Sequence, residues 1–165
     1  KKANILVVDD TSENLMLLCS VLKGEGYNTF PADSGELALS SLENNIPDLI
    51  LLDIRMAGMD GFEVCRRIKQ RENLAEIPII FLSVATDIED KLEGFRLGAV
   101  DYVTKPFQKE ELLIRVKTQL DIFFMIKTLK EQTDNIATLN EEYLATIEEL
   151  RDAREKVEVS EGNFR

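Results

Sequence analysis

Four short apolar runs in this sequence are each followed by polar side chains that can do chemistry. The runs at 5–8, 49–52, 77–82 and 100–103 are followed, in order, by Asp9 and Asp10, by Asp53, by Ser83, and by Thr104 and Lys105. In an open parallel sheet, ligands bind at the carboxyl ends of the strands. If the runs are strands of one such sheet, three carboxylates, the Ser83 hydroxyl and the Lys105 ammonium group meet at one edge.

This set of groups favours phosphoryl transfer with a magnesium ion. Three carboxylates packed together raise one another's pKa unless a cation joins them. Oxygen ligands suit Mg²⁺, which keeps some of its waters and takes one or two carboxylates plus a phosphate. A lysine and a serine hydroxyl suit the oxygens of a phosphoryl group. The chemistry predicted from the residues is phosphoryl transfer to an aspartate carboxylate that acts as the nucleophile.

The elements that must position these groups alternate along residues 1–120. Besides the four runs there is a weaker one at 27–31, and amphipathic helical patterns follow all five. The first pattern ends at Gly24, the second begins after Ser34 and the third begins after Asp60. The fourth stops before Gly98, and the fifth begins near Lys109. Apolar runs of four to six residues are typical of strands buried on both faces. This order predicts an α/β domain with a doubly wound, five-stranded parallel sheet.

Residues beyond 120 have a different pattern. There is no Gly and no Pro between 107 and 161, which predicts one helix on the order of 80 Å long at about 1.5 Å per residue. A seven-residue repeat places apolar side chains at the d positions Ile122, Leu129, Ile136, Tyr143, Leu150 and Val157. The a positions are Ile126, Thr133, Asn140, Ile147 and Arg154. We predict a parallel coiled-coil homodimer over 121–159, with Asn140 setting its register. The alternative is a helix that folds back onto its own domain.

Residues 1–120 resemble the receiver domain of a two-component response regulator, the family of the bacterial chemotaxis regulator. Four blocks carry the resemblance: ILVVDD at 5–10, DIRMAGMDG at 53–61, FLS at 81–83 and DYVTKP at 101–106. Their combination and spacing are specific, although each block alone is weak. The resemblance implies a flavodoxin-like (βα)5 fold, and it implies that a sensor histidine kinase or phosphotransfer protein supplies the phosphoryl group.

The resemblance also assigns the metal ligands and the phosphoacceptor. It makes Asp53 the phosphoacceptor and one ligand of Mg²⁺. Asp10 would bind the ion directly, Asp9 would bind it mostly through water, and the backbone carbonyl of Arg55 would be a further ligand. Alone, each aspartate has an ordinary alternative role as a turn or helix cap.

Four other residues receive roles in the switch from the same resemblance. Lys105 would pair with the phosphoryl group, next to a cis peptide bond at Pro106. Ser83 would donate a hydrogen bond to a phosphoryl oxygen, and Tyr102 would turn inward when Ser83 moves. The alternatives are that Ser83 caps the start of the next helix, where Thr86 and Asp87 also offer caps, and that Tyr102 simply packs at the sheet edge.

The sequence departs from the family pattern near the expected site. Ala57 stands where the family usually has proline, and Val84 follows Ser83 where a small residue is common. Arg55 adds a cation two residues after Asp53. Our hypothesis is that Arg55 and Val84 hinder the attacking water and lengthen the lifetime of the phosphoryl group.

Composition excludes several other classes of function. The net charge of −11 and the pI of about 4.6 argue against binding nucleic acid through bulk charge. The chain has no histidine, which removes Ser-His and Cys-His catalysis. No apolar stretch is long enough to span a membrane, and no signal-peptide pattern is present. Cys19 and Cys65 lie in apolar helical patterns, so we expect reduced core cysteines in a cytoplasmic protein.

The expected output is signalling rather than enzymatic turnover, beyond slow self-phosphorylation and self-dephosphorylation. Residues 160–165 resemble the lead-in to a PAS-type sensor domain, so we expect an output domain to follow. A nucleotide cyclase or a hybrid kinase is an alternative output, and a DNA-binding output is disfavoured by the long heptad stretch. A receiver-like dimerisation scaffold that works without phosphate is the remaining alternative.

Overall fold

The computed structural model describes residues 2–84 and 88–162 of the chain. It divides into two units, Lys1–Phe123 and Phe124–Arg165. The first unit contains the sheet and the helices that cover it, and the described part of the second unit is the remainder of the last helix.

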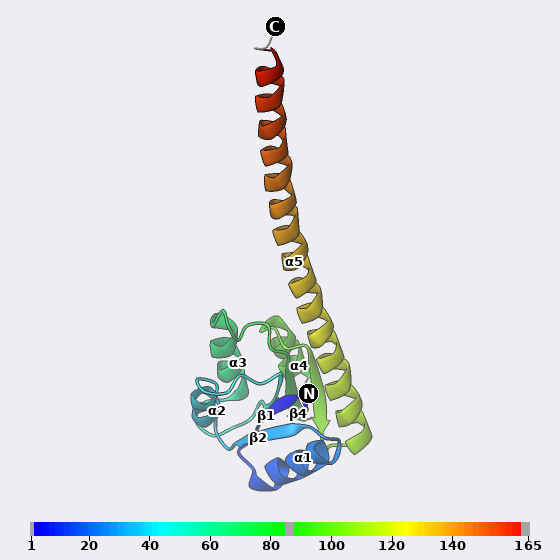
Figure 1. The fold of residues 1–165 in the computed structure, drawn as a ribbon. Coiled ribbons are helices and arrows are strands. Elements are labelled where there is room, and N and C mark those ends of the chain that lie inside the picture. The colour runs from blue at the N-terminus through cyan, green and yellow to red at the C-terminus, as the bar shows by residue number, and fades with distance from the viewer. Residues whose placement is uncertain (1, 85–87, 163–165) are drawn as a thin grey trace. The chain divides into compact units, whose positions relative to one another are not determined.

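The first unit is built on five parallel strands in the order β2-β1-β3-β4-β5. Figure 1 draws this sheet among its helices, with β1, β2 and β4 labelled. The strands are β1 (Asn4–Val8), β2 (Asn28–Ala32), β3 (Leu49–Asp53), β4 (Ile79–Val84) and β5 (Asp101–Lys105). The strand order reverses at β1, which pairs with β2 on one side and with β3 on the other. The predicted doubly wound parallel sheet is therefore confirmed, and its reversal point lies between β1 and β3.

Helices cover both faces of the sheet because the strand side chains alternate. On one face, Ile5 and Val7 of β1 pack with side chains of α1 (Ser12–Gly24) and of the first turns of α5 (Lys109–Gly162). On the other face, Leu6 and Val8 pack with side chains of α2 (Gly35–Ser41) and α3 (Gly61–Gln70). The free cysteines Cys19 and Cys65 are buried, one in each of these two clusters.

Short-range signals explain where α2 and α3 begin. The Ser34 hydroxyl accepts a hydrogen bond from the backbone N–H of Leu37 at 3.1 Å, and the Asp60 carboxylate accepts one from Glu63 at 2.9 Å. These bonds satisfy donors that a helix start otherwise leaves unpaired. A Cβ at Gly61 would lie 2.2 Å from the backbone oxygen of Asp53, so only glycine fits beside the end of β3.

Helix α4 (Ile88–Arg96) is less buried than its pattern suggests. The apolar spacing predicts the helix correctly, yet Ile88, Leu92 and Phe95 are exposed. Among the described residues of α4, only Gly94 is buried, where a Cβ would lie 2.8 Å from the Phe81 ring. The helix therefore contacts the sheet through a glycine and leaves its apolar side chains outside. The possible caps Thr86 and Asp87 lie outside the described residues.

Helix α5 (Lys109–Gly162) has 54 residues and runs through both units. Leu112, Val116 and Leu120 are buried in the core of the first unit. Within the second unit the described side chains are exposed, apart from the partly buried Ile147. No helix of the described chain is long and apolar enough to cross a membrane.

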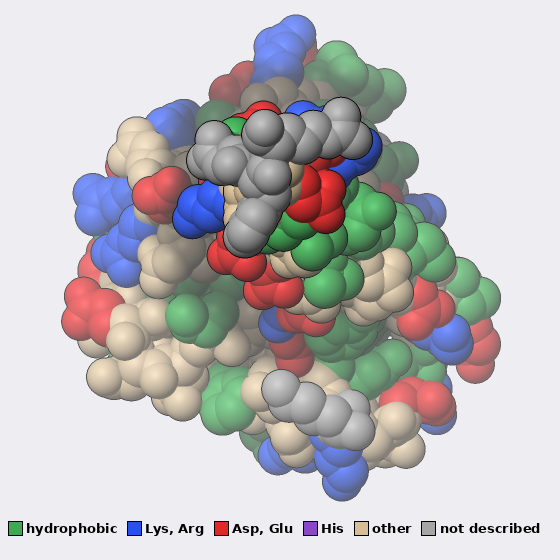
Figure 2. Space-filling model, turned by 45° about the horizontal axis from the view of Figure 1, so that its top comes forward, with side chains coloured by type: hydrophobic (Ala, Val, Ile, Leu, Met, Phe, Trp, Pro, Cys, Tyr) green, Lys and Arg blue, Asp and Glu red, His purple; other side chains and the backbone are tan. Residues whose placement is uncertain are grey.

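The surface carries both signs of charge. Figure 2 shows Lys and Arg side chains scattered among acidic, polar and apolar ones on the face that it draws. This mixed surface accompanies a net charge of −11.

Candidate functional site

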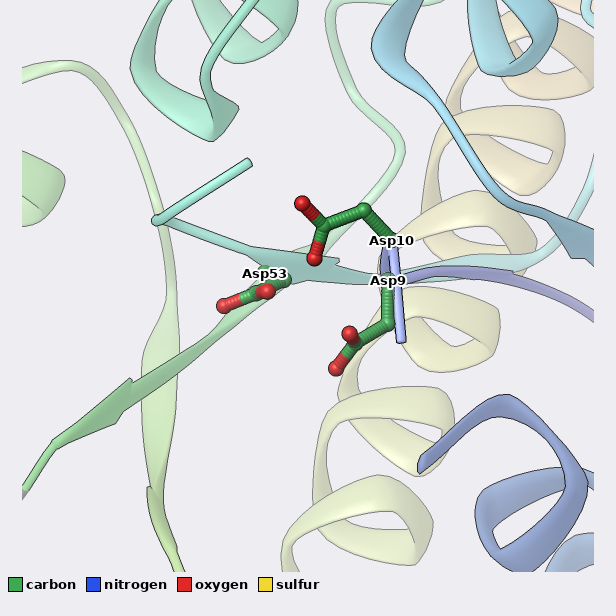
Figure 3. Close-up of side chains that lie close together, drawn as sticks. All are labelled: Asp9, Asp10 and Asp53. Carbon is green, nitrogen blue, oxygen red and sulfur yellow. The ribbon is translucent and has the colours of Figure 1, made fainter. Parts of the chain in front are cut away.

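Three aspartate side chains meet where β1 and β3 end. Asp9 and Asp10 directly follow β1, and Asp53 is the last residue of β3. Each contributes an oxygen, and these oxygens lie within 4.8 Å of one another (Figure 3). Asp9 and Asp53 are buried and Asp10 is exposed. The site thus lies at the reversal point of the strand order, where open α/β sheets bind ligands.

Lys105 joins two of these carboxylates from the end of β5. Its Nζ lies 3.0 Å from Oδ1 of Asp53 and 3.2 Å from Oδ2 of Asp9. The peptide bond between Lys105 and Pro106 is cis. The chain therefore brings one ammonium group from residue 105 to carboxylates at residues 9 and 53, which the sequence separates widely.

Burial sets the charge state of Asp53. Removal from water raises the pKa of its carboxyl group to about 6. A hydrogen bond from Lys105 opposes this rise, and the nearby charge of Asp9 adds to it. Burial alone would lower the pKa of Lys105, but its bonds to Asp53 and Asp9 raise that pKa overall. The ammonium group is therefore held in its charged form beside the carboxylates.

Backbone and side-chain donors orient the carboxylates. The N–H of Thr11 donates to Asp9 at 2.9 Å and Asn14 Nδ2 donates to Asp9 at 3.2 Å. The N–H of Ala57 donates to Asp10 at 3.1 Å. Sequence reasoning missed Asn14 and the backbone of Ala57. Asn14 was detectable because it follows Asp9 by five residues and lies in the first turn of α1, whereas a backbone donor leaves no signal in residue type.

Ser83 lies in β4 next to the strand that ends in Lys105. It pairs in register with Thr104 of β5. Its side chain is buried, and its hydroxyl makes no hydrogen bond within the described structure. An unpaired buried hydroxyl costs roughly 1–3 kcal/mol, so it calls for an explanation. A ligand oxygen at this edge of the sheet would satisfy it.

Tyr102 lies on β5 and is half-buried. Its ring meets Phe95 edge to face, with centroids 5.8 Å apart. Lys91 Nζ lies 4.2 Å from the ring centroid, and Arg115 approaches the ring at 5.7 Å. Arg115 is in turn held by Asp101, at 2.8 Å. The ring therefore lies among side chains of α4 and α5 and contacts two cations.

Arg55 follows Asp53 by two residues, and Val84 follows Ser83 at the end of β4. The N–H of Arg55 points to Asp53 Oδ1 over 3.4 Å, and its guanidinium pairs with Asp90 of α4 at 2.6 Å. This ion pair links the loop after β3 to α4. Val84, the last residue of β4, is 48% exposed, so its side chain faces outward next to Ser83.

The residues at this edge fit a magnesium ion by their chemistry. Three carboxylates within 4.8 Å of one another form an all-oxygen donor set. The pKa of Asp53 is raised mainly by burial, and the charge of Asp9, which a cation would neutralise, adds to the rise. Lys105 already neutralises part of the carboxylate charge from one side. The arrangement suits a group that carries both a divalent cation and anionic oxygens.

Comparisons with known proteins agree with this geometry. The family model for the response regulator receiver domain matches residues 5–117. The heme response regulator HssR of Staphylococcus epidermidis is 39% identical over 141 residues, which cover 86% of this chain and 61% of that protein. The response regulator PleD of Caulobacter vibrioides is 37% identical over 130 residues, which cover 79% of this chain and 29% of that protein. The chain thus spans less than two thirds of either relative.

A solved structure shares the fold. The chemotaxis protein CheY4 of Vibrio cholerae superposes with a TM-score of 0.69 at 30% sequence identity. The match covers 72% of this chain and 98% of that one.

Proposed function

Because the chain belongs to the response regulator receiver family, we propose that Asp53 accepts a phosphoryl group from the phosphohistidine of a partner kinase or phosphotransfer protein. The observation that carries this proposal is the buried Asp53 carboxylate, held 3.0 Å from Lys105 and within 4.8 Å of Asp9 and Asp10. Residues 1–165 contain no histidine, so the phosphohistidine donor lies outside this part of the sequence.

In the proposed reaction, an oxygen of Asp53 forms a bond to phosphorus as the bond between phosphorus and the donor nitrogen breaks. The lysine Nζ is placed to pair with a phosphoryl oxygen, and it stabilises charge that develops there. The unpaired Ser83 hydroxyl can donate a hydrogen bond to a second phosphoryl oxygen. The N–H of Arg55 and the packing around Asp53 keep the nucleophile in place.

Asp9, Asp10, Asp53 and the backbone carbonyl of Arg55 are the groups that would hold Mg²⁺. When bound, the ion neutralises the carboxylates and the transferred phosphoryl oxygens. The donors to Asp9 and Asp10 keep their carboxylates turned toward the site.

The output we propose is a change in a parallel coiled-coil dimer. The phosphoryl group adds nearly two negative charges beside β4 and β5, and α5 begins four residues after Lys105. Residues 121–159 would form the coil, with Asn140 in its core, and transmit the change to an output domain that follows residue 160. This is proposed from the heptad repeat and from the exposure of its apolar side chains.

The test of the proposed function is phosphorylation by a small phosphodonor. With acetyl phosphate and Mg²⁺, the chain should gain one phosphoryl group on Asp53, read by intact-mass spectrometry and peptide mapping. Asp53→Asn should gain none. Asp48→Asn is a matched control, since Asp48 accepts a hydrogen bond from Asn4 at the opposite edge of the sheet. Equal phosphorylation of the chain and of Asp53→Asn would contradict the proposal.

A further inference from the structure

The exposed part of α5 has more apolar surface than one coiled-coil seam requires. One row of apolar residues seven apart, called here the shared row because two seams can use it, is Ile122, Leu129, Ile136, Tyr143, Leu150 and Val157. The first flank, four residues after each, is Ile126, Thr133, Asn140, Ile147 and Arg154. The second flank, three residues after each, is Met125, Gln132, Leu139, Thr146 and Ala153. None of the five residues of the second flank is charged, although positions beside a seam usually carry charge.

Both flanks are accessible to a partner. Met125 and Leu139 of the second flank are 63% and 62% exposed, and Ile126 of the first flank is 47% exposed. Thr133 and Thr146 each donate their hydroxyl to a backbone carbonyl four residues earlier, at 2.8 and 3.0 Å. Because these hydroxyls are already paired, either threonine can be covered without leaving an unpaired polar group.

We propose that α5 carries two competing seams for a second copy of the chain, and that rotating each helix by about 50° exchanges them. The first seam packs the shared row with the first flank, and the second seam packs the shared row with the second flank. The proposal rests on the proposed function in taking a second copy as the partner. Both seams repeat every seven residues, which matches a parallel copy of the same helix in register.

Each seam has a feature that the other lacks. The first seam has β-branched Ile126 and Ile147 in its core, which favours two strands, but it also places Arg154 there. Arg154 lies with its side chain 82% exposed, paired with Glu158 of the same helix. Burying that cation is costly. The second seam moves it to the rim.

Charge complementarity supports a second copy on the second seam. In a parallel pair, the last position of each heptad (g) faces the e position of the partner helix, five residues further along. In the second seam, Glu149 then faces Arg154 of the other copy, and Lys156 faces Glu161. In the first seam, the corresponding pairs include Thr146 with Arg151, and none of them joins opposite charges. The first seam therefore has the β-branched core residues, and the second seam has the pairs of opposite charge.

Three threonines allow a matched cross-linking test. Thr133→Cys reports the first seam and Thr146→Cys reports the second. Thr138→Cys faces away from both seams, and its hydroxyl makes the same type of backbone bond, at 3.0 Å. Cys19 and Cys65 are buried, so the parent chain serves as the blank. We expect oxidation of the dimer to cross-link both seam positions faster than position 138.

A pair of adjacent substitutions should shift the balance in opposite directions. Leu139→Glu places a charge in the core of the second seam only, and Asn140→Glu does so in the first seam only. Leu139→Glu should raise the ratio of the cross-linking rate at 133 to the rate at 146 by at least about tenfold, and Asn140→Glu should lower this ratio. Circular dichroism and sedimentation check that each variant is folded and dimeric.

Two results would overturn the two-seam proposal. One is cross-linking at 146 no faster than at 138. The other is a ratio that neither glutamate changes while the dimer persists. Either would leave phosphorylation of Asp53 untouched, since mass spectrometry reads that separately. A monomer at all concentrations would overturn the second copy as partner, and with it both the proposed coiled coil and the two seams.

Discussion

At the scale of single residues, the energetic problem of this site is a buried carboxylate that must be ionised to act. Folding removes Asp53 from water and so raises the pKa of its carboxyl group from 3.8 to about 6. Lys105 compensates only in part, because burial has a larger effect on this pKa than the hydrogen bond from Lys105 and the charge of Asp9 adds to the rise. The residues that make the site reactive therefore make the folded chain less stable at neutral pH than it would be with a neutral side chain there.

The pH dependence of stability follows from this shift. The folded chain binds the Asp53 proton more tightly than the unfolded chain, so this contribution to stability is greatest below about pH 4 and is lost as pH rises through about 6. With EDTA present, Asp53→Asn should be more stable than the parent chain at pH 8, by up to about 3 kcal/mol. The gain should vanish near pH 4. Urea unfolding at both pH values measures it, and a less stable variant at pH 8 would contradict the argument.

Val84 provides a test of phosphoryl lifetime. Its branched side chain is half-exposed directly after Ser83, at the edge where the phosphoryl group is expected. Val84→Ala should open access for water and speed hydrolysis of the aspartyl phosphate several-fold, measured by loss of the phosphorylated mass after the donor is removed. Val100→Ala is the matched control, since Val100 is 41% exposed just before β5 at the opposite edge of the sheet. Equal hydrolysis rates in parent and Val84→Ala would remove the hypothesis.

Whether the role of a single residue can be predicted from sequence depends on whether that role requires a particular residue type at a particular place. Asp53 and Lys105 were identifiable because a strand end and a chemical type together specify them. The Ala57 N–H was not, since any residue except proline supplies one. The Arg55–Asp90 pair was not predicted either, because it joins residues 35 apart through side chains that many positions share.

At the scale of elements, burial separates the two ends of α5. Leu120 is 3% exposed and Leu150 is 65% exposed, although both belong to the same helix. Leu120→Ala should lower the stability of the sheet-containing unit by about 2–4 kcal/mol, because it removes packed side-chain volume. Leu150→Ala should leave that unit's unfolding unchanged and weaken dimerisation instead. Chemical unfolding followed by tyrosine fluorescence, together with sedimentation equilibrium, separates the two effects.

The outcome that would contradict this division is an equal loss of unfolding stability in both variants. That result would mean that the second half of α5 folds back onto the domain, which is the alternative that the sequence leaves open.

The positions of the elements were largely predictable, and their burial was less so. All five strands begin and end within two residues of the apolar runs. Continuous apolar sequence indicates burial on both faces, which holds for β1, β3 and β4, whereas β2 is mostly exposed and β5 is only partly buried. For α4 the periodicity gave the helix but not its contacts. The helix α4 contacts Phe81 through Gly94. Because glycine has no side chain, the spacing of apolar residues does not reveal this contact.

At the scale of the whole molecule, the question is whether charge at Asp53 changes the association of two chains. A shift of a two-state equilibrium from 1:99 to 99:1 needs roughly 5.5 kcal/mol of differential binding. Hydrogen bonds to a charged group contribute about 1.5–3 kcal/mol each, so Ser83, Lys105 and one backbone donor can supply it. Both side chains lie on strands that precede α5, so their movement acts on elements that lead into the helix.

Beryllofluoride with Mg²⁺ mimics the phosphoryl group and tests this link without turnover. We expect the dissociation constant of the dimer, measured by sedimentation equilibrium, to change by at least about tenfold, because two or three new charge-assisted bonds exceed the roughly 1.4 kcal/mol that this requires. Asp53→Asn should show no change, and Ser83→Ala should show a reduced one because it lacks the buried hydroxyl. An identical dissociation constant with and without the mimic in the parent chain, while Asp53 still becomes phosphorylated, would separate the phosphate chemistry from the coil and leave another surface of the receiver as the output.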